Sequence, residues 1–159
     1  MNAPTRKLPL KPGKPKSSAA VKQATPDSKL VMDMVGDTYA VISTMRNGIP
    51  ARSISDTAAR LGVSQERLFE SLRLPKSTLK GRISKNALLS SAEQDRIYRA
   101  ERVWARAVDV LEDEAAARSW INRENRTLGG EAPLALLDTE VGYELVLDTL
   151  GRIEYGVVS

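Results

Sequence analysis

Neither histidine nor cysteine occurs among the 159 residues, which limits the chemistry that this chain can perform. Without imidazole, the usual general base near neutral pH is missing, and so is the commonest metal ligand. Ser-His and Cys-His nucleophiles are excluded for the same reason. The carboxylates of Glu112-Asp113-Glu114 fall at a junction between two predicted helices, where they serve capping and solvation. We therefore expect no catalytic residue, no metal site and no cofactor, and the protein is predicted not to be an enzyme.

The side chains available for chemistry are cations and hydroxyls near the start of a helix that the sequence predicts from Lys76 to about Ile83. Together with the segment that begins at Gln65, this helix has the spacing of a DNA-binding helix-turn-helix. Short polar and cationic side chains near a helix N-terminus fit the major groove and contact phosphates. The candidate DNA-binding residues are Lys76, Ser77, Thr78, Lys80, Arg82 and Lys85.

An earlier register competes with this one. Ala58–Ser64 also fits a helix and turn, and the recognition helix would then be Ser64–Leu72. That helix offers Glu66 and Glu70 to the phosphates, and two carboxylates facing phosphates are unfavourable, so we prefer the later register. Two features oppose the later one: Arg73 stands where a turn glycine is common, and Gly81 costs about 1 kcal/mol relative to alanine and could end the helix early. Ordinary packing of two short helices is the plain structural alternative.

The net charge of +4 conceals a strong asymmetry along the chain. Residues 1–28 carry +5, residues 46–85 carry +6, and residues 86–159 carry −6. A basic front half and an acidic back half indicate two different partners, one of them polyanionic. Residues 1–28 are rich in Pro, Lys and Ser, and we predict a disordered basic tail there, either a solubilising segment or an arm that follows nucleic-acid phosphates.

Helical periodicity runs through the rest of the chain, and the predicted fold class is all-α. A helix-turn-helix bundle is expected over residues 29–88 and a small helical domain over residues 89–159. No apolar run approaches the roughly 18 residues that span a bilayer, and the N-terminus has no secretory signal, so we expect a cytoplasmic protein without a membrane partner. The predicted helices are residues 29–47 with a break near Gly36, 53–61, 64–72, 76–83, 92–111, one beginning at Asp113, 133–137 and 141–155.

The C-terminal half holds the most specific motif. Trp120 is followed by Leu128-Gly129-Gly130-Glu131-Ala132-Pro133-Leu134 and then by Leu150-Gly151-Arg152-Ile153-Glu154-Tyr155-Gly156. The paired glycines permit a turn that other residues resist, and Gly142 allows the last helix to approach closely. This pattern resembles the Xre/MbcA/ParS-type antitoxins, and the similarity covers nearly everything after residue 40. The family often shows two adjacent basic residues where this chain has Gly81-Arg82.

The resemblance implies a type II toxin-antitoxin role. Such antitoxins neutralise a RES-domain toxin that acts on NAD, and they bind the promoter of their own operon. The family's C-terminal end lies at the entrance of the toxin's active site. The implied partners are a RES-domain toxin, operator DNA and a second copy of the chain, because palindromic half-sites are read by two-fold pairs. The implied toxin-binding residues are Leu150, Arg152, Ile153, Glu154, Tyr155, Gly156 and Val157.

Two alternatives stay open at this point. The chain could be a stand-alone helix-turn-helix transcription regulator whose C-terminal half only dimerises or senses a ligand. The apolar end, which includes Ile153, Val157 and Val158, could also fold back onto the chain's own helix bundle instead of meeting a partner.

Overall fold

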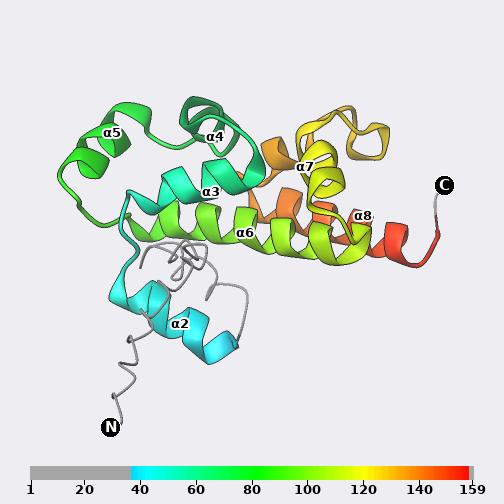
Figure 1. Ribbon diagram of the computed structural model, residues 1–159, viewed down its shortest axis with the longest axis horizontal. Helices are drawn as coiled ribbons and strands as arrows, with labels where there is room; N and C mark the ends of the chain where they lie inside the picture. The colour runs from blue at the N-terminus through cyan, green and yellow to red at the C-terminus, as the bar shows by residue number, and fades with distance from the viewer. Residues whose placement is uncertain (1–36, 158–159) are drawn as a thin grey trace, which may run out of the picture.

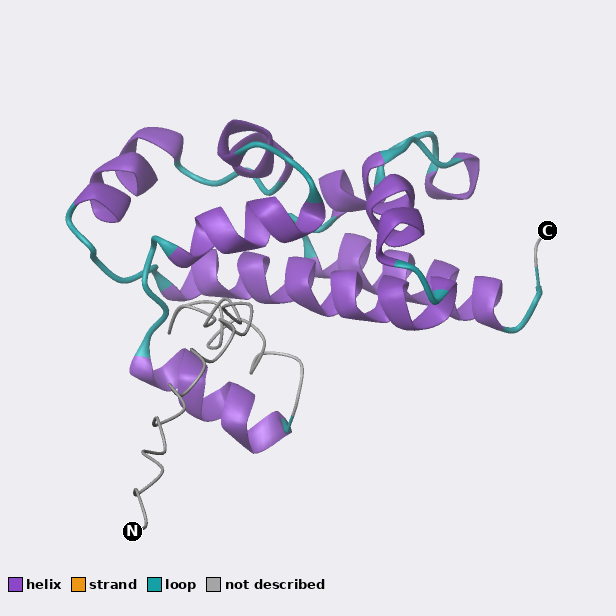
Figure 2. Cartoon of the chain, in the orientation of Figure 1, coloured by secondary structure: helices purple, strands orange, loops and turns teal. Residues whose placement is uncertain are grey.

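The computed structural model describes residues 37–157, and all regular structure in that range is helical (Figures 1 and 2). An isolated antiparallel bridge joins Pro50 to Leu88, and no strand forms among the described residues. The predicted all-α class is confirmed. The helices are α2 (Thr38–Asn47), α3 (Ser53–Leu61), α4 (Gln65–Ser71), α5 (Lys76–Ser84), α6 (Ser91–Leu111), α7 (Glu114–Asn122), the 3₁₀ helices η1 (Arg126–Leu128) and η2 (Pro133–Leu136), and α8 (Glu140–Glu154).

Short-range signals in the sequence explain where these helices begin and end. Gly62 adopts φ +71° directly after α3, the left-handed conformation that glycine accepts most readily. The Ser64 hydroxyl accepts a hydrogen bond from the Arg67 N–H at 3.2 Å and caps α4. Ser90 and Glu93 form the predicted capping box at the start of α6. Gly81 does not end α5 early, because the helix continues to Ser84.

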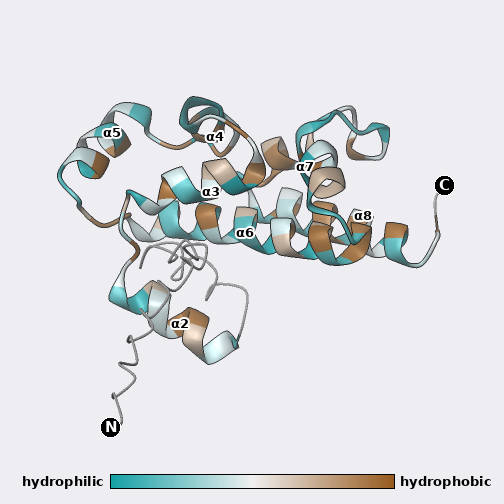
Figure 3. Ribbon diagram, viewed as in Figure 1, coloured by the Kyte–Doolittle hydropathy of each residue, from teal (hydrophilic) through white to brown (hydrophobic). Residues whose placement is uncertain are grey.

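The 21-residue helix α6 is the axis of the molecule. Helices α3, α7 and α8 pack against it, and α2 lies on the side of α6 opposite α3 in Figure 1. A single hydrophobic core runs from Ile49 to Leu150 and includes residues from both halves of the chain. Figure 3 shows apolar residues recurring along both α6 and α8, which pack against each other. The two halves therefore share one core along α6.

Part of the sequence-based description lies outside the described residues. This applies to the predicted basic tail over residues 1–28, to the helix start expected near Lys29, and to Val158. Within residues 37–157, no helix combines the length and the apolar character that crossing a membrane requires.

Candidate functional site

The α4–α5 pair is held together by apolar side chains from both helices. The core buries Leu68 and Phe69 from α4, Leu72 at the C-cap of α4, and Leu79 from α5. Between the helices the Leu74 N–H donates to the Phe69 carbonyl at 2.8 Å, which closes the turn. The sequence predicted this pair of helices. The turn between them sets the direction of α5 relative to α4.

Arg73 occupies the turn position where glycine is common, and it does adopt a left-handed φ of +48°. This conformation is costly for a side chain with a Cβ atom. Two contacts hold it: Arg73 Nε lies 2.9 Å from Asp138 Oδ2, and Arg96 Nη1 donates to the Arg73 carbonyl at 2.7 Å. Neither partner was apparent from the sequence, because Asp138 and Arg96 are distant along the chain.

The outer face of α5 is polar and cationic. Lys76, Ser77, Thr78 and Lys80 are exposed, and Lys85 is exposed directly after the helix. Leu79 is fully buried beneath them and Ile83 packs half-buried against the core, so the helix presents a polar face to solvent and an apolar side to the core. Five of the six predicted DNA-binding residues therefore lie on the surface around one short helix.

Two of the candidate DNA-binding cations, Lys80 and Arg82, form ion pairs within the protein. Lys80 Nζ lies 3.1 Å from Glu66 Oε1 across the helix pair, and the hydrogen bond from Lys80 lowers the pKa of Glu66. Arg82 is half-buried and its Nη1 pairs with the Glu93 carboxylate. That carboxylate also accepts from the Ser90 N–H at 2.7 Å. Arg82 thus holds α5 against the start of α6.

The competing register places α4 at the surface as the recognition helix. In the structure, Gln65 Nε2 donates to Ser55 Oγ at 2.6 Å and is engaged within the protein. The exposed residues Glu66 and Glu70 give this helix an acidic face, apart from Arg67. Of the two helices, α5 therefore carries the more cationic exposed face.

The loop after α7 is built around the Gly129-Gly130 pair, whose φ values are +70° and +85°. Asn125 caps the turn by accepting from the Thr127 N–H at 2.9 Å. The chain then enters η2 at Pro133 and buries Leu134 and Leu137. This loop fixes where α8 begins, and the predicted turn at the glycine pair is confirmed.

Gly142 shows the close approach that the sequence indicated. A Cβ atom at this position would lie 2.0 Å from the Leu136 carbonyl oxygen. The α8 backbone therefore packs directly on η2.

The last turn of α8 projects beyond the end of α6, at the opposite end of the molecule from α5 (Figure 1). Leu150 is fully buried and Ile153 is half-buried, whereas Tyr155 is 79% and Val157 is 59% exposed. The described part of the end does not fold back onto the bundle. Gly156 adopts φ +68°, and the Val157 N–H donates to the Arg152 carbonyl at 2.9 Å, which stops the helix.

The expectation that Leu150 contacts the toxin needs correction. Its side chain belongs to the protein's own core and is not accessible to a partner. Ile153 is half-buried, and Arg152, Glu154, Tyr155, Gly156 and Val157 are exposed at the end of the helix. Leu150 instead anchors the base from which this end projects.

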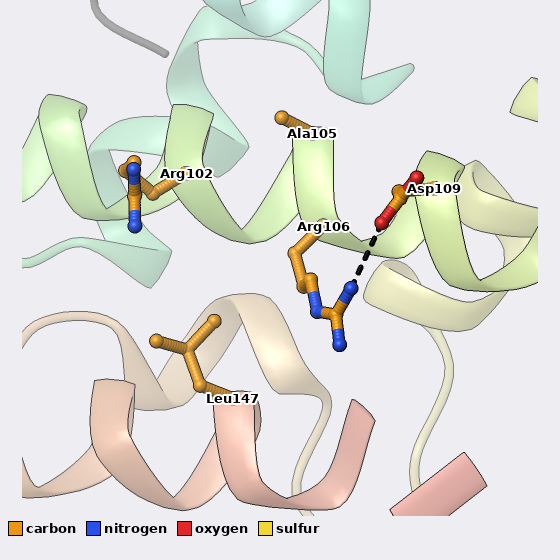
Figure 4. A pocket seen from close by; sticks show the side chains of 5 residues that line it. All are labelled: Arg102, Ala105, Arg106, Asp109 and Leu147. Carbon is orange, nitrogen blue, oxygen red and sulfur yellow. Dashed lines mark hydrogen bonds and ion pairs between the residues drawn. The ribbon is translucent and has the colours of Figure 1, made fainter. Parts of the chain in front are cut away.

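Ion pairs fix the charged side chains near this end. Arg152 Nη2 lies 2.8 Å from Asp148 Oδ2 one turn earlier. Arg106 from α6 pairs with Glu154 and, at 2.8 Å, with Asp109. Figure 4 shows Arg106 and Asp109 with Arg102 and Leu147 around a surface cavity of ≈ 370 Å³ between α6 and α8. The pair between Arg106 and Glu154 joins residues 48 positions apart in the chain, and it was not foreseen from the sequence.

A second surface cavity, of ≈ 310 Å³, lies beside Ile153. Trp120, Arg126 and Thr149 contribute to its wall. Trp120, the tryptophan of the sequence motif, therefore lies next to the C-terminal turn of α8. Only the folded arrangement reveals this proximity.

Two surfaces at opposite ends of one shared helix define the class of this protein: a helix-turn-helix protein with a C-terminal helical region packed on the same core. Residues 40–102 match the family model described as the antitoxin Xre-like helix-turn-helix domain. Residues 106–156 match the antitoxin Xre/MbcA/ParS C-terminal toxin-binding domain. The chain belongs to the Xre/MbcA/ParS antitoxin family, and the resemblance seen in the sequence is confirmed.

The curated relatives that the chain resembles are named as antitoxins. The chain is 28% identical over 120 residues to an antitoxin Xre of Yersinia enterocolitica, across 75% of this chain and 81% of the relative. It is 40% identical over 79 residues to an antitoxin Xre of Photorhabdus laumondii, across 49% and 53% of the two chains. A Sphingobium protein named Prs ADP-ribosylating antitoxin is 26% identical over 127 residues, across 74% of this chain and 80% of that protein.

Proposed function

We propose that this chain neutralises a RES-domain, NAD-consuming toxin by placing the end of α8 in the toxin's active-site entrance, and that it represses its own operon by binding DNA through α5. The observation that carries the toxin half is the exposure of Tyr155 and Val157 at the tip of a domain that matches a toxin-binding model. The name of the Sphingobium relative supports the type of toxin, because ADP-ribosylation consumes NAD.

The side chains at the end of α8 are suited to blocking the entrance of the toxin's active site. Tyr155 offers a large amphipathic side chain of the kind that dominates protein interfaces, and Val157 extends the apolar surface beyond the helix. The pair between Asp148 and Arg152 is more than half exposed at both side chains, so it contributes little and can be exchanged for a contact with the toxin. In this proposal Ile153 and Gly156 set the direction of the tip, and Glu154 is held by Arg106.

Truncation after Gly151 tests the toxin half. We expect the shortened chain to fail to restore growth and cellular NAD when it is co-expressed with the toxin of the same operon. The core remains intact, because Leu150 and the residues before it are retained. Circular dichroism and gel-shift binding to the operator serve as the controls for folding and for DNA binding.

Full neutralisation by the truncated chain would contradict occlusion by the tip. Failure of the complete chain to neutralise any toxin, combined with normal operator binding, would favour the stand-alone regulator.

The DNA half of the proposal rests on the outer face of α5. Lys76, Ser77 and Thr78 lie in its first turn, where cations and short donors meet phosphates and base edges. Lys80 can exchange Glu66 for a phosphate, since both side chains of this pair are about half exposed. Arg82 acts by orienting the helix through Glu93, and Lys85 adds a cation where α5 ends.

Replacing Lys76 and Lys80 with alanine tests this surface. Each lost phosphate contact removes counterion release, so we expect weaker operator binding and a slope of log affinity against log salt that is smaller by about 2. The matched control is Arg123→Ala with Arg126→Ala, which removes the same charge from exposed positions at the other end of the molecule. Equal loss in both double variants would reject α5 as the contact.

A homodimer is part of the proposal. Palindromic operators present two half-sites, and a two-fold pair of chains reads them with one α5 each. Light scattering of the free chain and of its operator complex measures this directly, and one chain per operator would reject it.

A further inference from the structure

Exposed apolar side chains in the region that matches the toxin-binding model gather on one helix. Between residues 106 and 157, the large hydrophobic residues with high exposure are Val141, Leu145, Tyr155 and Val157. The first three belong to α8 or its C-cap, and Val157 lies two residues after the C-cap. The apolar surface therefore begins at the first turn of α8, far from the tip considered so far.

The spacing of these residues places them on one side of the helix. At 100° per residue, positions 141, 145, 148, 152 and 155 fall within an arc of about 80°, and they extend over about 21 Å. The opposite side of α8 carries Val146 and Leu150, which are buried in the core. We name the exposed side, defined by Val141, Leu145, Asp148, Arg152 and Tyr155, the outer face of α8.

The charges on and beside the outer face are predominantly acidic. Asp148 and Arg152 neutralise each other in its middle. Glu144 is exposed beside it, and Glu140 at its start is paired with Arg99 at 3.2 Å. A matching partner surface would be an apolar strip with a lysine or arginine opposite Glu144.

We infer that the toxin docks along the whole outer face of α8, from Val141 to Tyr155, and that this docking is separate from occlusion by the tip. The inference rests on the proposed function. The occupant is the toxin because the face is continuous with Tyr155 and Val157, and because the segment matches a toxin-binding model. Docking along the helix delivers the tip in a fixed orientation, whereas the tip alone would offer two exposed apolar side chains.

The test is the affinity of the full chain for a catalytically inactive RES-domain toxin from the same operon, measured by calorimetry. We expect Val141→Gln with Leu145→Gln to raise Kd at least tenfold while leaving the tip intact. The matched control is Tyr39→Gln with Leu88→Gln, which changes two residues of comparable exposure outside residues 106–156. This control is expected to change Kd less than twofold.

A second measurement uses the absence of cysteine from the chain. Single variants V141C, L145C and L88C are each labelled with a thiol reagent, with and without the toxin. We expect the toxin to slow labelling at positions 141 and 145 at least fivefold and to leave position 88 unchanged. Circular dichroism confirms that each variant keeps the helical content of the parent.

The outcomes separate the inference from the function on which it rests. Unchanged Kd and unchanged labelling at positions 141 and 145, with an unsubstituted chain that binds and neutralises, would overturn the inference alone. An unsubstituted chain that binds no toxin would overturn the proposed function as well. Protection at positions 141 and 145 by self-association of the free chain, with toxin affinity unaltered, would assign the face to a second copy and also overturn the inference.

Discussion

At the scale of single residues, Gly142 is required for packing, although the residue type alone does not indicate this. It lies in the first turn of α8, and its missing side chain lets the helix backbone reach the η2 carbonyl of Leu136. Gly151 lies in the same helix with open space around it. Two glycines of one helix therefore serve different purposes, and only the first is needed for packing.

We predict that Gly142→Ala lowers the free energy of unfolding by about 3 kcal/mol, because the new Cβ would force α8 away from the backbone of η2. Urea denaturation followed by circular dichroism measures the change. Gly151→Ala is the matched control, and we expect it to raise stability by up to about 1 kcal/mol. Equal effects of the two substitutions would contradict the packing role of Gly142.

At the scale of helices, α5 combines a proposed binding face with weak local stability. It has nine residues, Pro75 at its N-cap gives no side-chain hydrogen bond, and Gly81 lies in its interior. Its position depends on Leu79 in the core and on Arg82, which reaches the capping box of α6. Tertiary contacts therefore hold this helix more than its own sequence does.

We predict that Gly81→Ala raises the free energy of unfolding by about 0.5–1 kcal/mol, because alanine is the better helix former and no other atom lies within 4 Å of its Cβ. Thermal melting measures this gain. Gly62→Ala provides the contrast, since φ is +71° there and the same substitution should lower stability. A loss of stability on Gly81→Ala would contradict this prediction, because it would show that position 81 requires glycine for a reason other than helix propensity.

At the scale of the whole molecule, the two surfaces are joined by one core and by polar links. Arg73 in the turn before α5 pairs with Asp138, two residues before α8 begins. Arg99 of α6 donates to the Leu137 carbonyl at 3.0 Å and pairs with Glu140. We therefore expect a single cooperative unfolding transition for the two halves.

The buried carboxylate of Glu101 affects that transition. It is 1% exposed between α3 and α6, and burial raises its pKa above 4.5 although Arg60 lies 3.5 Å away. A raised pKa in the folded state means that the charged form opposes folding. This penalty is fully present above the raised pKa and disappears as the pH falls through it toward about 4.5.

We predict that Glu101→Gln makes the protein more stable at pH 7 and that its advantage shrinks as the pH falls toward 4.5, because glutamine resembles the protonated carboxyl. Urea unfolding of both proteins at several pH values gives the difference directly. Glu144→Gln, on the exposed side of α8, is the control and should show no such trend. An advantage for Glu101→Gln that grows on acidification would reverse the assigned sign.

Local chemistry in the sequence was sufficient to predict most of the helices. Caps at Ser64, Ser90 and Asp113 and the stop at Gly62 act through neighbouring residues, so their effects can be read without knowing the fold. The Leu-Gly-Gly motif and the C-terminal leucine and isoleucine pattern were likewise sufficient to identify the family. The sequence by itself determined the all-α class, most of the helices and the antitoxin family, but it did not predict η1.

Only the tertiary structure decided which of these side chains remain available to partners. Leu150 is buried in the core and Arg82 is held by Glu93, whereas Val141, Leu145 and Tyr155 stay exposed. The reason is physical. A helical period indicates which residues share a side, but burial and ion pairing depend on what the packed neighbours leave open, and those neighbours come from distant parts of the chain.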